Sequence, residues 1–408
     1  MKKILFISLT VIVITLLSFS GCAEETTSGP AAGTIKIGYM SSLSGPFAAV
    51  EQFTTPAVQM VIDNVNAAGG INGRQLELVM RDDQGDPSIA SVKLNELKAA
   101  GIVIGVGPLL DPMAEVIAQW ALDNKIPWII TNAATMSLST TKFNKYEFHT
   151  KPNPLALARI YAKEISKQDI TTIYEIGADM LLAHEVYDFF WQEIKKVKPS
   201  VTEVGANWVG GFEMEFSNII SAALAKNPDM IMSGVAGPPW VSLVQQAQRF
   251  NLFDKTKVSG NHLLGSDLTT PFGDAYPTGI QGPTWCPFWL DEKPMKDFRD
   301  AYLARTKLYP ADITIEYYLA AMAAVEALKK AGNTNADSLV SALEKITIDG
   351  PTGKLHFRDF DHQLVQPVWW ATTGYVAEYP IAIGLNMTKY QEEVYPTKDE
   401  ILALRSAK

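Results

Sequence analysis

The stretch "NAAGGINGRQLELVMRDDQGDP" (Asn66–Pro87) decides the fold class, because it holds one complete strand between two helical segments. The sequence "GGINGR" is typical of a turn. "LELVM" (Leu76–Met80) is a short apolar run of the length expected for a buried strand. Asp86 and Pro87 then supply an N-cap and a first-turn proline for a helix predicted over Ser88–Ala99. Helix, turn, strand and helix in this order indicate an α/β fold.

The acidic residues Asp82 and Asp83 follow the predicted strand directly. A calcium loop of the helix–loop–helix type needs alternating oxygen ligands and a late Glu. The sequence "DDQGDPSIASVK" has neither feature. We therefore interpret these acids as loop residues at the carboxyl end of a strand, where open α/β sheets place polar groups.

The same alternation of strands and helices fills the first part of the chain. Thr55-Pro56 is interpreted as a helix start, with Pro at the first helical position. The segment "FHTKPNP" (Phe148–Pro154) breaks the pattern. The other elements predicted before it are strands at Ile35–Met40, Ile102–Val106 and Pro127–Thr131 and a helix at Met113–Asn124.

After this break the alternation of strands and helices begins again and continues to "GIQGPTWCP" (Gly279–Pro287). Two similar α/β halves with several crossings predict two doubly wound parallel-sheet lobes. A ligand would bind between them, at loops that follow the strands. The predicted elements are strands at Thr171–Ile176, Val201–Trp208, Asp229–Val235, Thr256–Ser259, Thr352–Phe357 and Val365–Thr373, and helices at Leu181–Lys196, Met214–Ala225, Trp240–Phe250, Met295–Leu308, Glu316–Ala331 and Ala336–Ile346.

The N-terminus carries the pattern of an export signal. Lys2 and Lys3 precede the apolar run Ile4–Leu17, which is shorter than the roughly 20 residues that cross a bilayer. Two small residues before Cys22 resemble the lipobox of bacterial lipoproteins, which implies lipidation of Cys22. The alternative is a plain secreted protein cut near this cysteine. Residues 1–22 are therefore interpreted as signal peptide and lipobox, and 23–33 as a flexible tether.

Composition limits the function classes. The chain has 408 residues, which is long enough for two domains with sizeable cores. Its two cysteines, Cys22 and Cys286, leave no intrachain disulfide once Cys22 carries lipid. The net charge is −9, and no segment concentrates Lys and Arg with aromatic residues. Nucleic acid is therefore not an expected partner.

Motifs for catalysis or cofactors are incomplete. "GVGPLL" (Gly105–Leu110) lacks the third Gly of a dinucleotide fingerprint, and no phosphate loop or G-x-S-x-G elbow occurs. "HEVYD" (His184–Asp188) lacks the second His of a zinc helix. "HFRDFDH" (His356–His362) offers two imidazoles and two carboxylates, but its acids read as turn residues. Cys286 has no base near it in sequence. We expect no enzyme activity, no metal and no cofactor.

Several segments together resemble the branched-chain amino-acid-binding family of periplasmic receptors. The resemblance extends from about Thr34 to Thr373. It implies a type I periplasmic-binding fold, with two lobes joined by three hinge crossings that close around a small solute. It also implies delivery of that solute to an ABC permease of the branched-chain amino-acid type. The segments are "IKIGYMSSLSGPFAAV", "VNAAGGINGRQLELVMRDDQGDP", "NKIPWIITNAAT" and "FEMEFSNIISAALAKNPDMIMSGV".

The resemblance also implies a division of the chain and a location. Lobe I comprises 34–150 and 285–349, lobe II comprises 151–284 and 350–385, and 386–408 form a C-terminal tail. The expected hinges are Phe148–Pro154, Gly282–Pro287 and Asp349–Gly353. Together with the lipobox, this predicts an exported lipoprotein of the cell envelope, held at a membrane by its lipid anchor.

The family's ligand-carboxylate site falls, by resemblance, on "GPLLDP" and "TNAAT" in lobe I. Ala133, Ala134 and Thr135 keep the expected backbone and hydroxyl donors. Leu110, Asp111 and Pro112 replace a Ser-rich turn, and an acid is a poor neighbour for a ligand carboxylate. Phe47 and Val50, in the first matching segment, belong to the predicted site as well.

In lobe II the resemblance predicts contacts at Leu182, at Val235 or Ala236, and at Asn261 and His262. Amino-acid binders carry an acid where this chain has Asn261 and His262, and burying an ammonium without an acid is costly. The expected ligand is an aromatic or other apolar carboxylate or a branched-chain-type amino acid. For an amino acid, Asp111 would replace the missing acid as the partner of the ammonium. Urea and amides are further alternatives. A sensor that passes lobe closure to a membrane signalling partner is the alternative function.

Overall fold

The computed structural model describes residues 33–406. The predicted signal peptide, the lipidation site Cys22 and all but the last residue of the predicted tether lie outside the described residues. From residue 33 to residue 406, no helix is both long enough and apolar enough to span a membrane.

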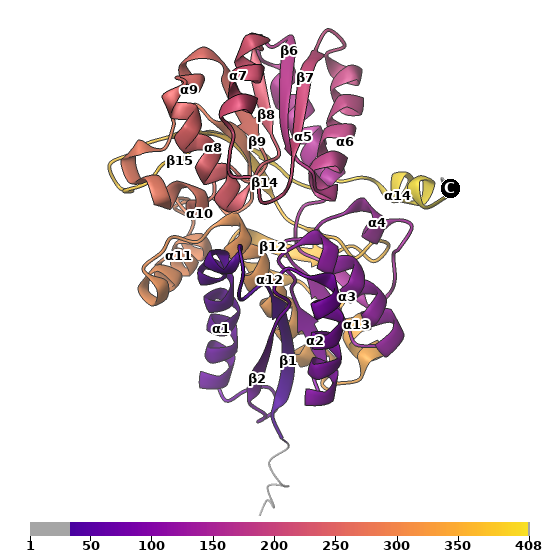
Figure 1. The fold of residues 1–408 in the computed structure, drawn as a ribbon. Coiled ribbons are helices and arrows are strands. Elements are labelled where there is room, and N and C mark those ends of the chain that lie inside the picture. The colour runs from indigo at the N-terminus through magenta and orange to yellow at the C-terminus, as the bar shows by residue number, and fades with distance from the viewer. Residues whose placement is uncertain (1–32, 407–408) are drawn as a thin grey trace, which may run out of the picture. The chain divides into compact units, whose positions relative to one another are not determined.

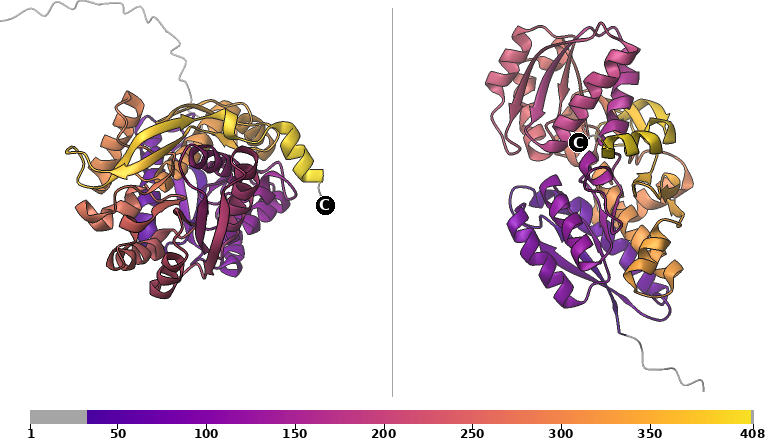
Figure 2. Two further views of the ribbon diagram at one scale, coloured as in Figure 1. Left: turned by 90° about the horizontal axis from the view of Figure 1, so that it is seen from above. Right: turned by 90° about the vertical axis from the view of Figure 1, so that its right-hand side faces the viewer.

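Lobe I is built on a five-stranded parallel sheet with the order β2-β1-β3-β4-β5. Three late helices join this lobe, since α12 packs against α1, β3 and β4, and Figures 1 and 2 show the orange helices beside the indigo and purple segments. The elements are β1 (Ile35–Ser41), η1 (Ala48–Val50), α1 (Glu51–Ala67), β2 (Leu76–Asp82), α2 (Pro87–Ala100), β3 (Ile104–Val106), α3 (Asp111–Asn124), β4 (Trp128–Ile130), α4 (Met136–Ser139), β5 (Glu147–His149), α11 (Lys293–Thr306), α12 (Asp312–Ala331) and α13 (Ala336–Leu343).

Lobe II is built on a seven-stranded sheet with the order β15-β14-β10-β9-β8-β6-β7. The strands from β10 to β7 are parallel, which confirms the predicted doubly wound lobe. β14 and β15 add an antiparallel edge that the sequence pattern did not indicate. The elements are α5 (Pro154–Ser166), β6 (Thr172–Ala178), α6 (Leu181–Val197), β7 (Thr202–Val209), α7 (Ser217–Ala225), β8 (Met230–Ser233), α8 (Gly237–Arg249), α9 (Leu252–Lys255), β9 (Lys257–Gly260), α10 (Ser266–Thr269), η2 (Thr270–Ala275), β10 (Gln281–Thr284), β14 (Val368–Gly374) and β15 (Ile383–Tyr390).

A small antiparallel sheet of β11 (Ile348–Gly350), β12 (Gly353–Phe357) and β13 (Leu364–Val365) precedes the last return to lobe II. β11 packs on α12 of lobe I, and after β13 the chain returns to the seven-stranded sheet at β14. We therefore propose that the third crossing lies at 358–367 rather than at Asp349–Gly353. The predicted tail begins inside β15, and it continues as η3 (Glu392–Val394) and α14 (Lys398–Ser406).

Buried hydrogen bonds join the first crossing to the third and hold the second to α12. The side-chain amide of Gln363 donates to Lys151 O (2.8 Å), and that of Gln366 donates to Thr150 O (2.7 Å). These two bonds join the first crossing to the third. The Oδ1 atom of Asp312 accepts bonds from the second crossing, from the amides of Trp285 (2.8 Å) and Cys286 (2.7 Å).

The acidic residues after the second strand, Asp83 and Asp86, have the structural roles that the sequence indicates. Asp86 caps α2, and its Oδ1 accepts a hydrogen bond from Ser88 N (2.7 Å). Asp83 is fully buried and accepts from Ser42 Oγ (2.7 Å) and Gly85 N (2.9 Å). The bond from Ser42 ties the loop after β2 to the loop after β1, and the bond from Gly85 closes the turn within the loop after β2. The interpretation as loop residues is confirmed for Asp83, whereas Asp82 is the last residue of β2.

The predicted start of α1 at Thr55-Pro56 is wrong, because the helix begins at Glu51 and contains Pro56. The buried Glu51 carboxylate accepts hydrogen bonds from Tyr39 Oη (2.8 Å) and Thr55 Oγ1 (2.9 Å), which anchor an additional first turn. Pro56 cannot donate to the carbonyl of Gln52, four residues earlier. The hydroxyl of Tyr302 donates to that oxygen instead (3.2 Å).

Each lobe pairs a strand glycine with a tryptophan on the neighbouring strand. Gly105 lies opposite Trp128, and Gly177 lies opposite Trp208. A Cβ atom at Gly105 would lie 2.1 Å from Cε3 of Trp128, and one at Gly177 would lie 2.3 Å from Cε3 of Trp208. Trp128 is fully buried and donates to Gly107 O (2.8 Å), whereas Trp208 is half-buried.

We predict that Gly105→Ala destabilises the protein by about 3 kcal/mol, because the indole of Trp128 has no room to move. Gly177→Ala is the matched comparison and should cost about 1 kcal/mol, because Trp208 can shift toward solvent. Urea denaturation of both variants measures the free energy of unfolding. An equal or smaller loss at Gly105 would contradict this packing argument.

Candidate ligand-binding site between the lobes

A cavity of about 130 Å³ lies between the two lobes. Its walls come from residues that follow β1, β3, β4 and β5 in lobe I and β6, β7, β8 and β9 in lobe II. The carboxyl ends of both sheets therefore face one space, as expected for an open α/β ligand site. A dry cavity of about 150 Å³ holds one benzene molecule. The volume therefore suits one small organic molecule.

Most of the predicted ligand-binding residues line this cavity. They are Phe47, Val50, Leu110, Asp111, Leu182, Val235, Ala236, Asn261 and His262.

Pro112, Ala133, Ala134 and Thr135 are not brought to the cavity wall. Pro112 is exposed in the first turn of α3, and Ala133 is fully buried. The amide of Ala134 donates to Asp111 Oδ1 (3.3 Å), so an internal carboxylate already uses the donor that was expected to hold the ligand. The hydroxyl of Thr135 bonds to Ser137 Oγ (3.0 Å).

Asp111 links the two lobes. Its carboxylate also faces the backbone amide of Leu182, in the first turn of α6. Free amides and the helix dipole favour negative charge at such a helix start. Burial raises the pKa of Asp111, while Lys151 and the two amides counteract that rise.

Two further contacts cross the cleft. Glu185 on α6 accepts a hydrogen bond from Met136 N on α4 (2.9 Å), and burial raises the pKa of Glu185 to about 7. Phe47 of lobe I meets Phe212 of lobe II with ring centroids 5.2 Å apart. The lobes are thus in direct contact around the cavity.

Lys151 is a cavity residue that the sequence analysis missed. It lies in the first crossing, is only 4% exposed, and donates from Nζ to Asn132 O and Asn132 Oδ1, both at 2.9 Å. The available signal was a lysine inside the break "FHTKPNP", where a hinge residue can reach both lobes.

His262 connects lobe II to α12 of lobe I. Its Nε2 lies 3.0 Å from Asp267 Oδ2, and its Nδ1 lies 3.5 Å from Asp312 Oδ2. Burial alone would lower the pKa of His262, but the two carboxylates raise it to about 10. The ring is therefore a cation at neutral pH, with both nitrogens directed at acids. It can contact a ligand through its ring while it holds the lobes together.

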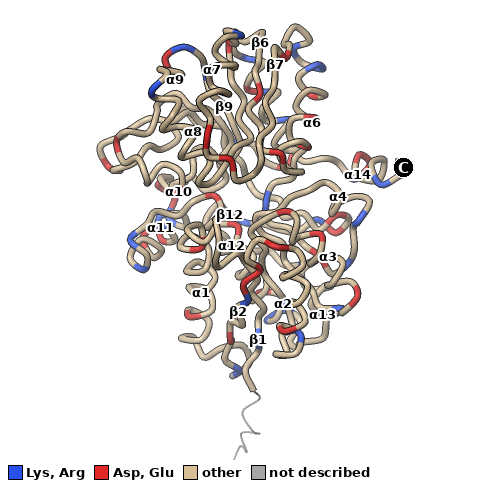
Figure 3. Tube along the Cα trace, in the orientation of Figure 1, with Lys and Arg blue, Asp and Glu red and all other residues tan. Residues whose placement is uncertain are grey.

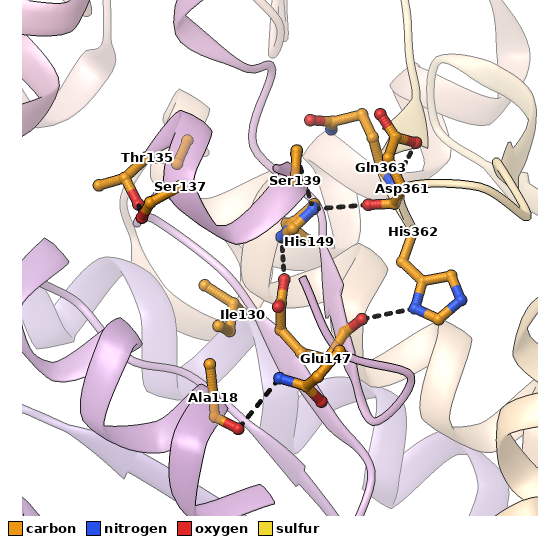
Figure 4. Close-up of polar contacts among 12 residues, drawn as sticks. Ala118, Ile130, Thr135, Ser137, Ser139, Glu147, His149, Asp361, His362 and Gln363 are labelled. Atoms are coloured by element: carbon orange, nitrogen blue, oxygen red, sulfur yellow. Dashed lines mark hydrogen bonds and ion pairs between the residues drawn. The ribbon is translucent and has the colours of Figure 1, made fainter. Parts of the chain in front are cut away.

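A Ser–His–Glu arrangement near the hinge resembles a nucleophile site in its distances (Figure 4). His149 Nδ1 lies 2.6 Å from Glu147 Oε1, and Nε2 lies 3.3 Å from Ser139 Oγ and 3.0 Å from Asp361 O. A carbonyl oxygen only accepts, so Nε2 carries a proton. Burial lowers the pKa of His149, but Glu147 and Asp361 raise it above its ordinary value. Since Nε2 already carries the proton that it donates to Asp361 O, it cannot take the serine proton.

The residues of "HFRDFDH" do not converge. His356 is exposed, while His362 is buried and stacks on Phe148, with ring centroids 3.9 Å apart. Asp361 pairs with Arg358. Within residues 33–406, no three His, Cys, Asp or Glu side chains are grouped so that they could hold a metal ion.

Lys and Arg positions are interspersed with Asp and Glu along the chain (Figure 3).

The sequence pattern of the family described as "Periplasmic binding protein" matches residues 34–374. The chain belongs to this family. A leucine-, isoleucine-, valine-, threonine- and alanine-binding protein of Pseudomonas aeruginosa is 26% identical over 338 residues, which are 80% of this chain and 86% of the relative.

Solved structures share the fold of this periplasmic binding protein. One is a solute-binding protein of an ABC transporter from Rhodopseudomonas palustris BisB5 in complex with 3,4-dihydroxybenzoic acid. It has a TM-score of 0.80 at 20% identity and covers 88% of this chain and 97% of its own. Another, from R. palustris in complex with 4-hydroxybenzoate, has a TM-score of 0.80 at 19% identity and covers 88% of this chain and 98% of its own.

The buried carboxyl of Glu316 makes the free energy of unfolding depend on pH. It is fully buried on α12, and burial raises its pKa from 4.5 to about 8. The folded protein therefore keeps this proton across a pH range in which the unfolded chain has lost it. The unfolded state binds fewer protons there, so stability falls as pH rises from about 4.5 to 8.

We predict that Glu316→Gln weakens the fall in melting temperature between pH 5 and pH 8, because Gln keeps the shape of the protonated acid without its titration. The exposed residue Glu203 supplies the control variant Glu203→Gln, which should follow the wild type. Thermal unfolding at the two pH values measures the difference. A pH dependence that stays unchanged in Glu316→Gln would contradict the role given to this carboxyl.

Proposed function

We propose that this chain is an extracytoplasmic solute-binding protein that captures a small organic solute between its lobes and delivers it to an ABC transporter. The observation that carries the proposal is the apolar interlobe cavity with a few polar groups, formed where the strands of both lobes end. Such concave, mostly apolar spaces with sparse polar contacts are typical of small-molecule sites.

The ligand class is an aromatic or apolar carboxylate or a branched-chain-type amino acid. The Pseudomonas relative is described as a binder of leucine and similar amino acids, and the two Rhodopseudomonas structures hold hydroxybenzoates. Their descriptions as parts of an ABC transporter favour a permease partner over a signalling partner. The apolar walls, which include Met180, Tyr187 and Met232, suit the body of either ligand.

Closure around the solute supplies the mechanism. The solute binds one lobe, and rotation at the three crossings brings the other lobe over it. The contacts Asp111–Leu182, Glu185–Met136 and Phe47–Phe212 form only when the lobes meet. A solute that touches both lobes stabilises the closed form by its differential contacts.

Lipidation of Cys22 would keep this receptor at a membrane surface while its lobes work in water. The support is the small-small-Cys pattern after an apolar segment and the family to which the chain belongs. The other cysteine, Cys286, is buried and suits no lipid attachment.

We predict that the chain starting after Cys22 is stabilised by at least one member of a panel of leucine, isoleucine, valine, phenylalanine, benzoate, 4-hydroxybenzoate, short fatty acids and urea. A ligand at 100 times its dissociation constant adds about 2.7 kcal/mol. That free energy should raise the melting temperature by roughly 2 °C or more. Thermal-shift measurement of the panel tests this, and no shift with any member at millimolar concentration would contradict the proposed ligand class.

A further inference from the structure

Lys151 brings a buried cation to the cavity without a carboxylate partner. Its side chain lines the cavity, the residue is 96% buried, and within residues 33–406 no carboxylate oxygen forms an ion pair with it. An ammonium has three hydrogens to donate. Its hydrogen bonds go to the neutral Asn132, through O and Oδ1, and Trp285 presents its ring 5.8 Å away.

The acids around Lys151 are engaged elsewhere. Glu316 keeps its proton at neutral pH, because burial raises its pKa to about 8. Burial raises the pKa of Asp111 and Lys151 counteracts that rise. Asp111 nevertheless forms no ion pair with Lys151 among residues 33–406 and faces the amides of Ala134 and Leu182. Asp267 and Asp312 share the cation of His262. A buried charge without a partner is unfavourable, so the site is better suited to an anion that arrives with the ligand.

Lobe II supplies buried acceptors to the same cavity. Asn261 Oδ1 and Asp267 Oδ1 are buried and have no hydrogen-bond partner among residues 33–406, and both residues line the cavity. Buried polar atoms without partners are rare in folded proteins. They fit a ligand that donates a hydrogen bond, from a hydroxyl or an amino group.

Most of the remaining wall is apolar and comes from both lobes, although Tyr161 and Ser233 also line the cavity. Phe47 and Leu110 belong to lobe I, and Met180, Tyr187 and Met232 belong to lobe II. No polar atom in these side chains other than the Tyr187 hydroxyl could pair with a second charge. The body of the ligand between its polar groups is therefore hydrocarbon.

We infer that Lys151 binds the carboxylate of the ligand and that Asn261 accepts a hydrogen bond from a second polar group of the same molecule. This inference rests on the proposed function and names its substrate class. The ligand is a small apolar or aromatic carboxylate that carries one hydrogen-bond donor. The donor is either the hydroxyl of a hydroxy acid or the ammonium of an amino acid. Lys151 contacts the ligand directly from the hinge, so closure and recognition of the anion occur at one residue.

The test compares acids with neutral amides of the same shape. Isothermal titration of the chain starting after Cys22 uses 4-hydroxybenzoate against 4-hydroxybenzamide, and leucine against leucinamide. We expect the wild type to bind one acid roughly 100-fold more tightly than its amide, because losing one partner of a buried charge pair has an effect of this size. The pair that shows this preference distinguishes the hydroxy acid from the amino acid.

Lys151→Met should reduce the preference for the acid to roughly threefold or less. The control Lys226→Met makes the same change at an exposed position and should keep the wild-type preference. Asn261→Leu should lower the preference for 4-hydroxybenzoate over benzoate if the donor is a hydroxyl, or for leucine over 4-methylpentanoate if it is an ammonium. Circular dichroism checks that each variant is folded.

Two results would overturn the inference while the proposed function stands. One is equal binding of the acid and its amide by the wild type, a result that can be measured without any variant. The other is a folded Lys151→Met that keeps the full preference for the acid. Failure of every acid, amino acid and amide to bind the wild type would instead overturn the proposed function, and the inference with it.

Discussion

The structure depends on one constraint, which is that three separate chain crossings must run together between two sheets. The carboxylate of Asp312, at the start of α12, holds the second crossing to lobe I by accepting two amide hydrogen bonds from it. Gln363 and Gln366 bond the third crossing to carbonyls of the first. The buried pair of Glu147 and His149 supports the same region (Figure 4). With the first and third crossings bonded to each other and the second bonded to α12, the strand ends of both sheets face one cavity.

Because of that geometry, a bound ligand can shift the equilibrium between separated and closed lobes. The walls of the cavity belong to both lobes, and Lys151 belongs to a crossing. Contacts of the ligand are therefore lost when the lobes separate, so its binding energy favours closure. Asp111 completes the closed arrangement, because its carboxylate bonds within lobe I and also faces the first turn of α6 in lobe II. A permease that distinguishes the closed form would respond to the solute without touching it.

Local patterns predicted the fold, and distant contacts decided the rest. Asp86 and Pro87 marked the start of α2 because capping uses neighbouring residues alone. The start of α1 was missed because it depends on Tyr39 and Tyr302, which reach Glu51 and Gln52 from other elements. In the cavity, the resemblance placed Asn261 and His262 after the correct strand. It could not show that Asp111 uses the amide of Ala134, or that the hinge turns Lys151 inward, because neither fact is local in sequence.

The most direct test of the account is the distance between the lobes in solution. Spin labels on cysteines introduced at Val92 in lobe I and Met214 in lobe II use exposed side chains, and the remaining described cysteine, Cys286, is buried. Pulsed dipolar spectroscopy should give a longer and broader distance distribution without ligand, and one shorter, narrower distance with a saturating ligand from the panel. An unchanged distribution at saturation would contradict the claim that the solute is captured by closure of the two lobes.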